Sequence, residues 1–248
     1  MNTVEDGGPL SFFKALHGAF TDTLRAGDRA NLAQSLAAQA LNTYEGNIGI
    51  QSEGLPPVAC FKGCSPCCVL RIAATAPEVF LIAQYLEATA PAYARADIDL
   101  LGELARADRL TRGLNEDERM RSRQRCPFLV SDVCAIYQVR PLSCRGHTSF
   151  DRQACADALS GKQTEVPVSE PHAAVRAIVQ NALQSALRDF SLAWGAYELN
   201  HALTIALADA ACQSRWLAGQ DVFAPALVDG FDFAETAKTF DAINAGAG

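Results

Sequence analysis

The sequence lacks the features that would send a chain into or across a membrane. A spanning helix needs about 18–20 consecutive apolar residues, and no such run occurs among the 248 residues. The first residues, Met1 to Pro9, contain neither the basic start nor the apolar stretch of a signal peptide. We therefore expect a cytoplasmic protein without a membrane partner.

Basic residues are too few and too dispersed for binding to nucleic acid. The chain has 21 Lys and Arg against 28 Asp and Glu, which gives a formal net charge of -7. The densest basic stretch, Arg119 to Arg125, directly follows Glu116, Asp117 and Glu118. Because nucleic-acid binding depends on Lys and Arg that neutralise phosphate, we expect no nucleic-acid partner.

Several common catalytic motifs are also absent. The sequence contains no Walker loop, no dinucleotide-binding glycine fingerprint, no zinc-protease HExxH motif and no internal repeat. Nucleotide chemistry on a glycine-rich loop therefore has no support.

What the sequence does contain is helical periodicity on both sides of a cysteine-rich region. Apolar residues recur at helical spacing in segments near 11–27, 28–45, 75–90, 95–112, 169–190 and 199–210. Hydrophobic residues make up 49% of the chain, enough for a core without disulfides at this length. The pattern predicts a mainly α fold, a helical bundle that carries an irregular cysteine-rich module.

The same signals suggest how the chain is divided. We expect a helical hairpin and a loop over 1–57, a cysteine-cluster region with two inserted helices over 58–159, and C-terminal helices over 160–248, all in one compact domain. The glycines and the Pro-Pro pair of 46–57 predict the loop, and a brief strand is compatible with 69–74.

Individual helix ends can also be predicted. Thr75-Ala76-Pro77-Glu78 has the signature of a capping box with proline in the first turn, and Pro91 is expected to follow the end of that helix. In the segment 95–112 the buried side is expected to carry Ile98, Leu101 and Ala105.

Seven of the nine cysteines fall in two short windows. The first window has the spacing C-x3-C-x2-C-C, and the second contains three further cysteines. In order, the seven are Cys60, Cys64, Cys67, Cys68, Cys126, Cys134 and Cys144. Clustered thiols in a reducing cytosol are typical of metal sites rather than of disulfides. The windows therefore predict a thiolate cage around a metal.

The spacing leaves the metal open. Cys60, Cys64 and Cys67 with one thiol of the second window would suit a 4Fe-4S cluster, which we favour, whereas zinc also accepts four cysteines and seven thiols could supply a binuclear site. Nearby positive charges would offset an anionic cage. They belong to Lys62, Arg71, Arg140 and Arg145.

Helical periodicity is lost between Cys126 and His147. A turn at Ser131-Asp132 is compatible with a short hairpin, and Pro141 can open a one-turn helix. The segment therefore has the pattern of a small irregular module.

The cysteine pattern resembles the CxxCxxCC cysteine-cluster family (YkgJ-like), whose members are described as zinc- or iron-chelating and often labelled iron-sulfur oxidoreductases. The resemblance covers about residues 58–147 and includes C-P-F-L and C-x-I-Y-x-x-R-P-x-x-C-R. Related patterns occur in flagellin lysine N-methylases. The first gap here, between Cys60 and Cys64, is x3 rather than the x2 of the family pattern.

The resemblance implies a set of site residues. It marks the seven cysteines of the two windows as metal ligands, and Tyr137, Arg140, Pro141 and Arg145 as supporting residues. Two further candidates come from the residues themselves, because His147 lies three positions beyond Cys144 and Cys155 could complete a second site. Cys212 is expected in the helical core, and His201 has the pattern of a structural histidine.

Three functions remain compatible with these observations. The first is an iron-sulfur protein with a redox or small-molecule-activating role, which as an enzyme would be an iron-sulfur oxidoreductase with a redox partner protein. The second is a zinc-binding structural or interaction module. The third is a metal store or chaperone, which surplus thiols would suit.

Overall fold

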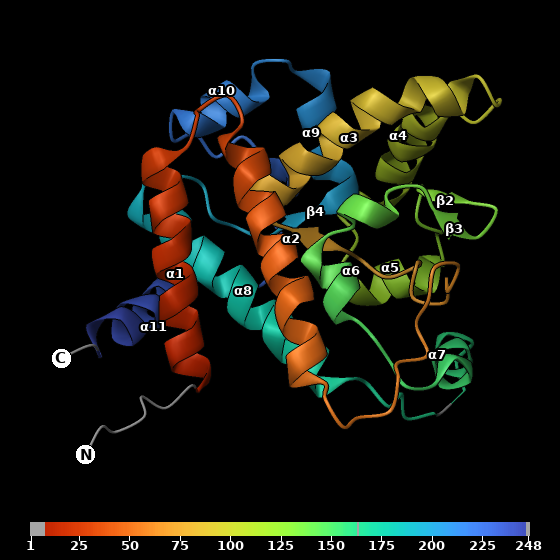
Figure 1. The fold of residues 1–248 in the computed structure, drawn as a ribbon. Helices are drawn as coiled ribbons and strands as arrows, with labels where there is room; N and C mark the ends of the chain where they lie inside the picture. Colours follow the sequence, from red (N-terminus) through yellow and green to blue (C-terminus); the bar gives the residue numbers. More distant parts are fainter. Residues whose placement is uncertain (1–7, 163, 247–248) are drawn as a thin grey trace.

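The computed structural model describes residues 8–162 and 164–246, and helices dominate it (Figure 1). The predicted class, mainly α with an irregular cysteine-rich module, is confirmed. None of the helices of these residues combines the length and hydrophobicity needed to cross a bilayer. Residues 1–7, which carry most of the signal-peptide argument, lie outside the described residues.

One group of helices surrounds α8 (Glu170–Asp189), which packs against α1 (Pro9–Ala26) and α2 (Leu32–Gln51). Four apolar residues at helical spacing in α1 are buried. These residues are Phe13, Leu16, Phe20 and Leu24. The last helix, α11 (Phe233–Ala245), covers α1 and places Phe240 against Phe13. Burial of such apolar surface is the main stabilising contribution to the fold.

A second group of helices packs on the other side of α2. It consists of α3 (Ala76–Ala94), α4 (Leu100–Thr111), α9 (Leu199–Ala208), α10 (Cys212–Leu217) and the 3-10 turn η2 (Ala224–Ala226). Helix α3 contacts α2, α4 and α9. Cys212 is 1% exposed, so its predicted place in the helical core is confirmed.

The start of α3 follows the predicted capping box. The Glu78 carboxylate accepts hydrogen bonds from the backbone N–H and the hydroxyl of Thr75, both at 2.8 Å. Glu78 also accepts the backbone N–H of Leu142 at 2.7 Å. Because Leu142 begins the short helix α6 (Leu142–Gly146), this buried carboxylate ties the cysteine-rich module to the helical core.

The module itself is built from short elements. Strands β2 (Leu129–Val130) and β3 (Val133–Cys134) pair as a hairpin, followed by the 3-10 turn η1 (Tyr137–Val139) and α6. Ser131 and Asp132 have φ angles of 48° and 63°, and two positive φ angles in a two-residue loop are typical of a tight hairpin turn. The predicted hairpin and the helix after Pro141 are therefore confirmed.

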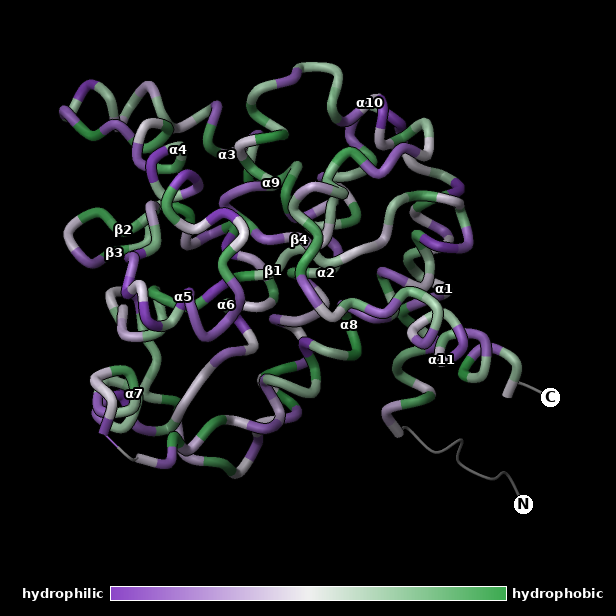
Figure 2. Tube along the Cα trace, turned by 180° about the vertical axis from the view of Figure 1, so that it is seen from behind, coloured by the Kyte–Doolittle hydropathy of each residue, from purple (hydrophilic) through white to green (hydrophobic). Residues whose placement is uncertain are grey.

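Three further elements place the module in the fold. Helices α5 (Glu116–Ser122) and α7 (Arg152–Leu159) flank it, and β1 (Ala73–Ala74) pairs antiparallel with β4 (Tyr197–Glu198). Figures 1 and 2 show the hairpin, α5 and α7 at the opposite end of the molecule from α1 and α11. The module thus covers one end of the bundle.

Three local predictions were wrong. The loop expected from residue 46 begins only after Gln51, because α2 continues through its glycines. Helix α3 continues past Pro91 to Ala94: Pro91 forfeits one helical hydrogen bond, but its carbonyl still accepts the backbone N–H of Arg95 at 3.3 Å. Helix α4 begins at Leu100, because Asp97 has a φ of 57°. The helix buries Leu100, Leu104 and Ala107, not the predicted side with Ile98, Leu101 and Ala105.

Candidate metal centre

The two cysteine windows meet at one cavity. The backbone N–H of Cys126 donates to the carbonyl of Cys68 at 2.7 Å, which joins the second window directly to the first. Within the first window the chain turns tightly, and Gly63 has a φ of 104° that glycine adopts without strain. These turns bring closely spaced thiols to the wall of a cavity of about 450 Å³.

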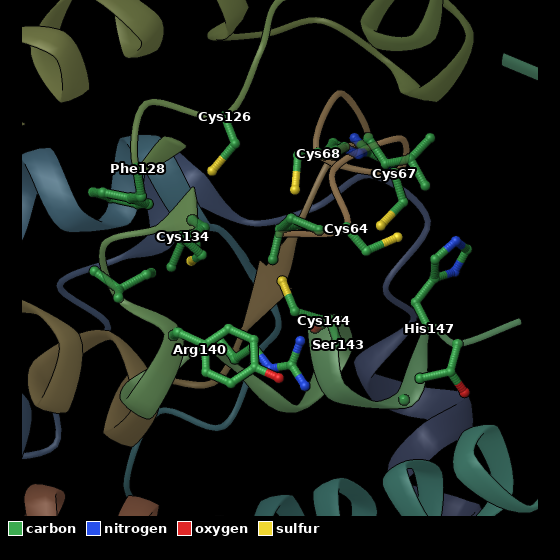
Figure 3. A pocket seen from close by; sticks show the side chains of 18 of the residues that line it. Cys64, Cys67, Cys68, Cys126, Phe128, Cys134, Arg140, Ser143, Cys144 and His147 are labelled. Carbon is green, nitrogen blue, oxygen red and sulfur yellow. The ribbon is translucent and has the colours of Figure 1, made fainter. Parts of the chain in front are cut away.

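Six of the seven predicted cysteines line this cavity. They are Cys64, Cys67, Cys68, Cys126, Cys134 and Cys144. In Figure 3 the side chains of Cys68, Cys126 and Cys144 point toward the same space. Within the described part of the chain, no three Cys, His, Asp or Glu side chains converge closely enough to form a ready-made site for one ion. Cys67 and Cys68 nevertheless lie close enough for their thiols to interact, and all six thiols stand on the wall of the same cavity.

Cys60 and Cys155 lie outside the lining of the cavity, on the far side of Ser149. The Sγ of Cys60 lies 3.5 Å from the backbone nitrogen of Ser149, and Cys155 interacts with the hydroxyl of the same serine. Burial raises the thiol pKa of both residues. Cys60 also interacts with the thiol of Cys64, so this outer pair borders the cavity without lining it.

Two of the predicted supporting residues lie at the cavity wall. Tyr137 and Arg140 both line it, and the Arg140 guanidinium lies 4.3 Å from the centre of the Tyr137 ring. The buried Nε of Arg140 has no hydrogen-bond partner among the described residues. No carboxylate of the described residues pairs with Arg140, whose charge acts on the thiols of Cys134 and Cys144.

Arg145 supports the site from behind, not from the cavity wall. Its Nε donates to the carbonyl of Arg140 at 2.9 Å, and Nη2 donates to the carbonyl of Gln138 at 2.6 Å. The same guanidinium pairs with Glu45 of α2. Arg145 consequently fixes the backbone between the hairpin and α6, which carries Cys144.

Burial makes the thiols of the second window poor acids on their own. It raises the pKa of Cys126 to about 12 and that of Cys144 well above its ordinary value, and nearby thiols add to both shifts. The charge of Arg140 opposes the rise in pKa at Cys134 and Cys144. Because a bound metal cation stabilises the thiolate form, this donor set suits a metal.

Two arginines near the thiols were not predicted from the sequence. Arg119 is 3% exposed, and its charge lowers the pKa of Cys126 against the effect of burial. Arg176 of α8 lines the cavity. Arg119 stands in a run of charged residues, and only the tertiary packing of α5 buries it.

The two histidines considered earlier have different surroundings. His147 lines the cavity, and partial burial together with the charge of Arg176 lowers its pKa, which favours the neutral imidazole that can bind a metal. His201 lies outside the thiol cavity, with its Nδ1 3.2 Å from a carboxylate oxygen of the buried Asp108. Of the two, only His147 is placed near the cysteines.

A glycine sets the contact between the module and α8. A Cβ built at Gly146 would lie 2.6 Å from the Cβ of Arg176, so Gly146→Ala is expected to lower the free energy of unfolding by about 1–3 kcal/mol through overpacking. The control is Gly46→Ala on α2, where a Cβ meets nothing within 4 Å and alanine should stabilise by about 0.5–1 kcal/mol. Urea denaturation measures both, and a stabilised Gly146→Ala variant would contradict the packing.

A helical bundle capped by a cavity with six cysteines is the framework of a metal-binding protein. Residues 59–162 match the CxxCxxCC family model, described as "Putative zinc- or iron-chelating domain". The resemblance seen in the cysteine spacing is thereby confirmed, and metal binding by this region is supported for zinc and iron alike. Searches of curated proteins and of solved structures gave no match.

Proposed function

We propose that the protein holds an iron-sulfur cluster in the thiol cavity and uses it for electron transfer or for activation of a small molecule. Ligands are drawn from Cys64, Cys67, Cys68, Cys126, Cys134 and Cys144, which line the cavity. An iron-sulfur centre would supply one-electron redox chemistry there. Cys60 and Cys155 lie outside the lining, so we do not include them among its ligands.

The observation that carries this proposal is a cavity of about 450 Å³ with six thiols on its wall. One zinc ion needs four ligands about 2.3 Å away and fills little space. A polynuclear cluster fills more space and accepts thiolates from several directions. The size of the cavity and the number of its thiols favour the cluster.

The surrounding residues suit such a centre. Phe128 and Ile136, both buried, form part of the wall and limit the access of water. Arg140 and Arg119 place positive charge near the thiols, which reduces the cost of gathering thiolates in a partly dry cavity. These residues would hold the cage together and tune the reduction potential.

A zinc-binding structural module is the second candidate. The observation that favours it is the cross-link between the windows, because a metal held by both would fasten the hairpin to the loop 60–68 and contribute to folding. A third candidate is metal storage or delivery. In that role the thiols of Cys60 and Cys155, outside the cavity lining, would bind the metal first as it enters.

Metal analysis combined with a visible spectrum distinguishes these functions. Protein purified without oxygen is expected to be brown, to contain iron and sulfide, and to lose visible absorption on reduction. A colourless protein with one zinc per chain that unfolds when chelated would replace the cluster with the structural module. Metal that binds reversibly in variable amounts would indicate storage or delivery.

A further inference from the structure

Beyond Cys64 and Cys67, whose side chains lie beside His147 in Figure 3, the wall of the thiol cavity is made by other residues. This end is lined by His147 and by three residues that follow the family-matched region, namely Val168, Ala173 and Arg176, whose charge acts on His147. In Figure 3 His147 lies on the opposite side of the cavity from Cys126 and Cys134. The whole cavity measures about 450 Å³, which is within the range of pockets that bind small organic molecules.

The cation at this end is not neutralised. Arg71 also lines the cavity, but it pairs with Glu116 at 3.2 Å and Asp229 at 3.5 Å. Arg176, in contrast, has no carboxylate within 4 Å in the described part of the chain, and its one side-chain hydrogen bond goes to Gln180 at 3.3 Å. The Arg176 guanidinium therefore has free donors for an anion.

The position of Arg176 is fixed by the scaffold. It lies on α8, the helix that contacts α1, α2 and α6, and its stem rests against Gly146, where any larger residue would clash. Val168 is 51% exposed and provides apolar surface at the same end of the cavity. A charged anchor beside apolar surface is suited to a molecule that has an anionic group and an apolar body.

We propose that this end of the cavity binds an anionic small molecule, a carboxylate or phosphate on an apolar body, with its anion on Arg176 and its body beside the metal centre. The inference rests on the proposed function, because the cysteine end is then filled by the centre and the ligand lies next to it. The ligand is accordingly the molecule that the centre reduces, oxidises or activates.

Isothermal titration calorimetry on the anaerobically purified protein tests this inference. The probes are hexanoate, hexyl phosphate, 1-hexanol and hexylammonium, which share a six-carbon chain and differ in charge. One or both anions are expected to bind once per chain at least about tenfold more tightly than hexanol, and hexylammonium is expected not to bind. The better of the two anions identifies the anionic group.

Variants of Arg176 link the binding to this residue. Arg176→Gln should weaken the tighter anion about tenfold or more, whereas Arg176→Lys keeps the charge and should retain part of the affinity. The control, Arg109→Gln, changes an exposed arginine of α4 and should bind like the unaltered protein. Hexanol binding as tight as hexanoate and hexyl phosphate, or unchanged anion binding in Arg176→Gln, would overturn the inference.

Metal content measured on the same samples separates the two proposals. If the protein contains metal but binds anions no better than hexanol, the proposed anion site is wrong and the proposed metal centre is unaffected. If the protein contains no metal, the proposed function fails, and the dependence of anion binding on Arg176 still decides the anion site.

Discussion

Replacing Cys144 with serine is expected to lower the metal content of the purified protein at least about tenfold. Cys144 lies on α6, which docks against α8, and its thiol is close enough to Cys126, Cys67 and Cys134 to feel their charges. It is therefore central among the donors of both windows. Serine keeps the size of the side chain but removes the sulfur, and mass spectrometry of the acid-digested protein measures the metal.

Cys212→Ser is the matched control for this experiment. The thiol of Cys212 is also buried, but Cys212 lies in α10. It belongs neither to the lining of the cavity nor to the pair formed by Cys60 and Cys155. Its replacement should leave the metal content unchanged even if it costs some stability. Equal loss of metal in both variants would show that unfolding, not ligation, explains the effect.

Glu78→Ala is expected to lower the free energy of unfolding by about 3 kcal/mol. The carboxylate is 1% exposed and accepts hydrogen bonds from the backbone N–H groups of Thr75 and Leu142. Truncation leaves buried donors without partners and opens a small cavity, and each effect is worth about 1–3 kcal/mol. Urea denaturation followed by circular dichroism measures the change.

The control for that prediction is on the same helix. Glu87 of α3 is exposed, so Glu87→Ala should change the stability by less than about 0.5 kcal/mol. Because Glu78 joins α3 to the first residue of α6, its loss should also loosen the helix that carries Cys144. A Glu78→Ala variant as stable as Glu87→Ala would mean that this buried connection is unimportant.

Features encoded by neighbouring residues were predictable from the sequence. The capping box at Thr75, the turn at Ser131-Asp132 and the helix after Pro141 depend on local backbone preferences, and all were found. Helix lengths were less predictable. Glycines at 46 and 49 suggested a loop, yet α2 continues through them because it is packed against α3 and α8.

The part of the candidate site inside the two cysteine windows was predictable, including Tyr137, Arg140 and His147 beside the cysteines. Closely spaced thiols indicate a cage whatever the fold, but the remaining wall comes from distant parts of the chain. Val168, Arg176 and Leu199 reach the cavity only after α8 and β4 have packed. Arg119 was missed for the same reason, since the sequence could not show which side of α5 would be buried.

The most direct test of the account is a crystal structure of anaerobically purified protein with anomalous difference maps at the iron and zinc edges. The account predicts a peak at the iron edge inside the cavity, with sulfur ligands from both Cys64–Cys68 and Cys126–Cys144. A peak bound by one window alone, or no peak between the two windows, would contradict it.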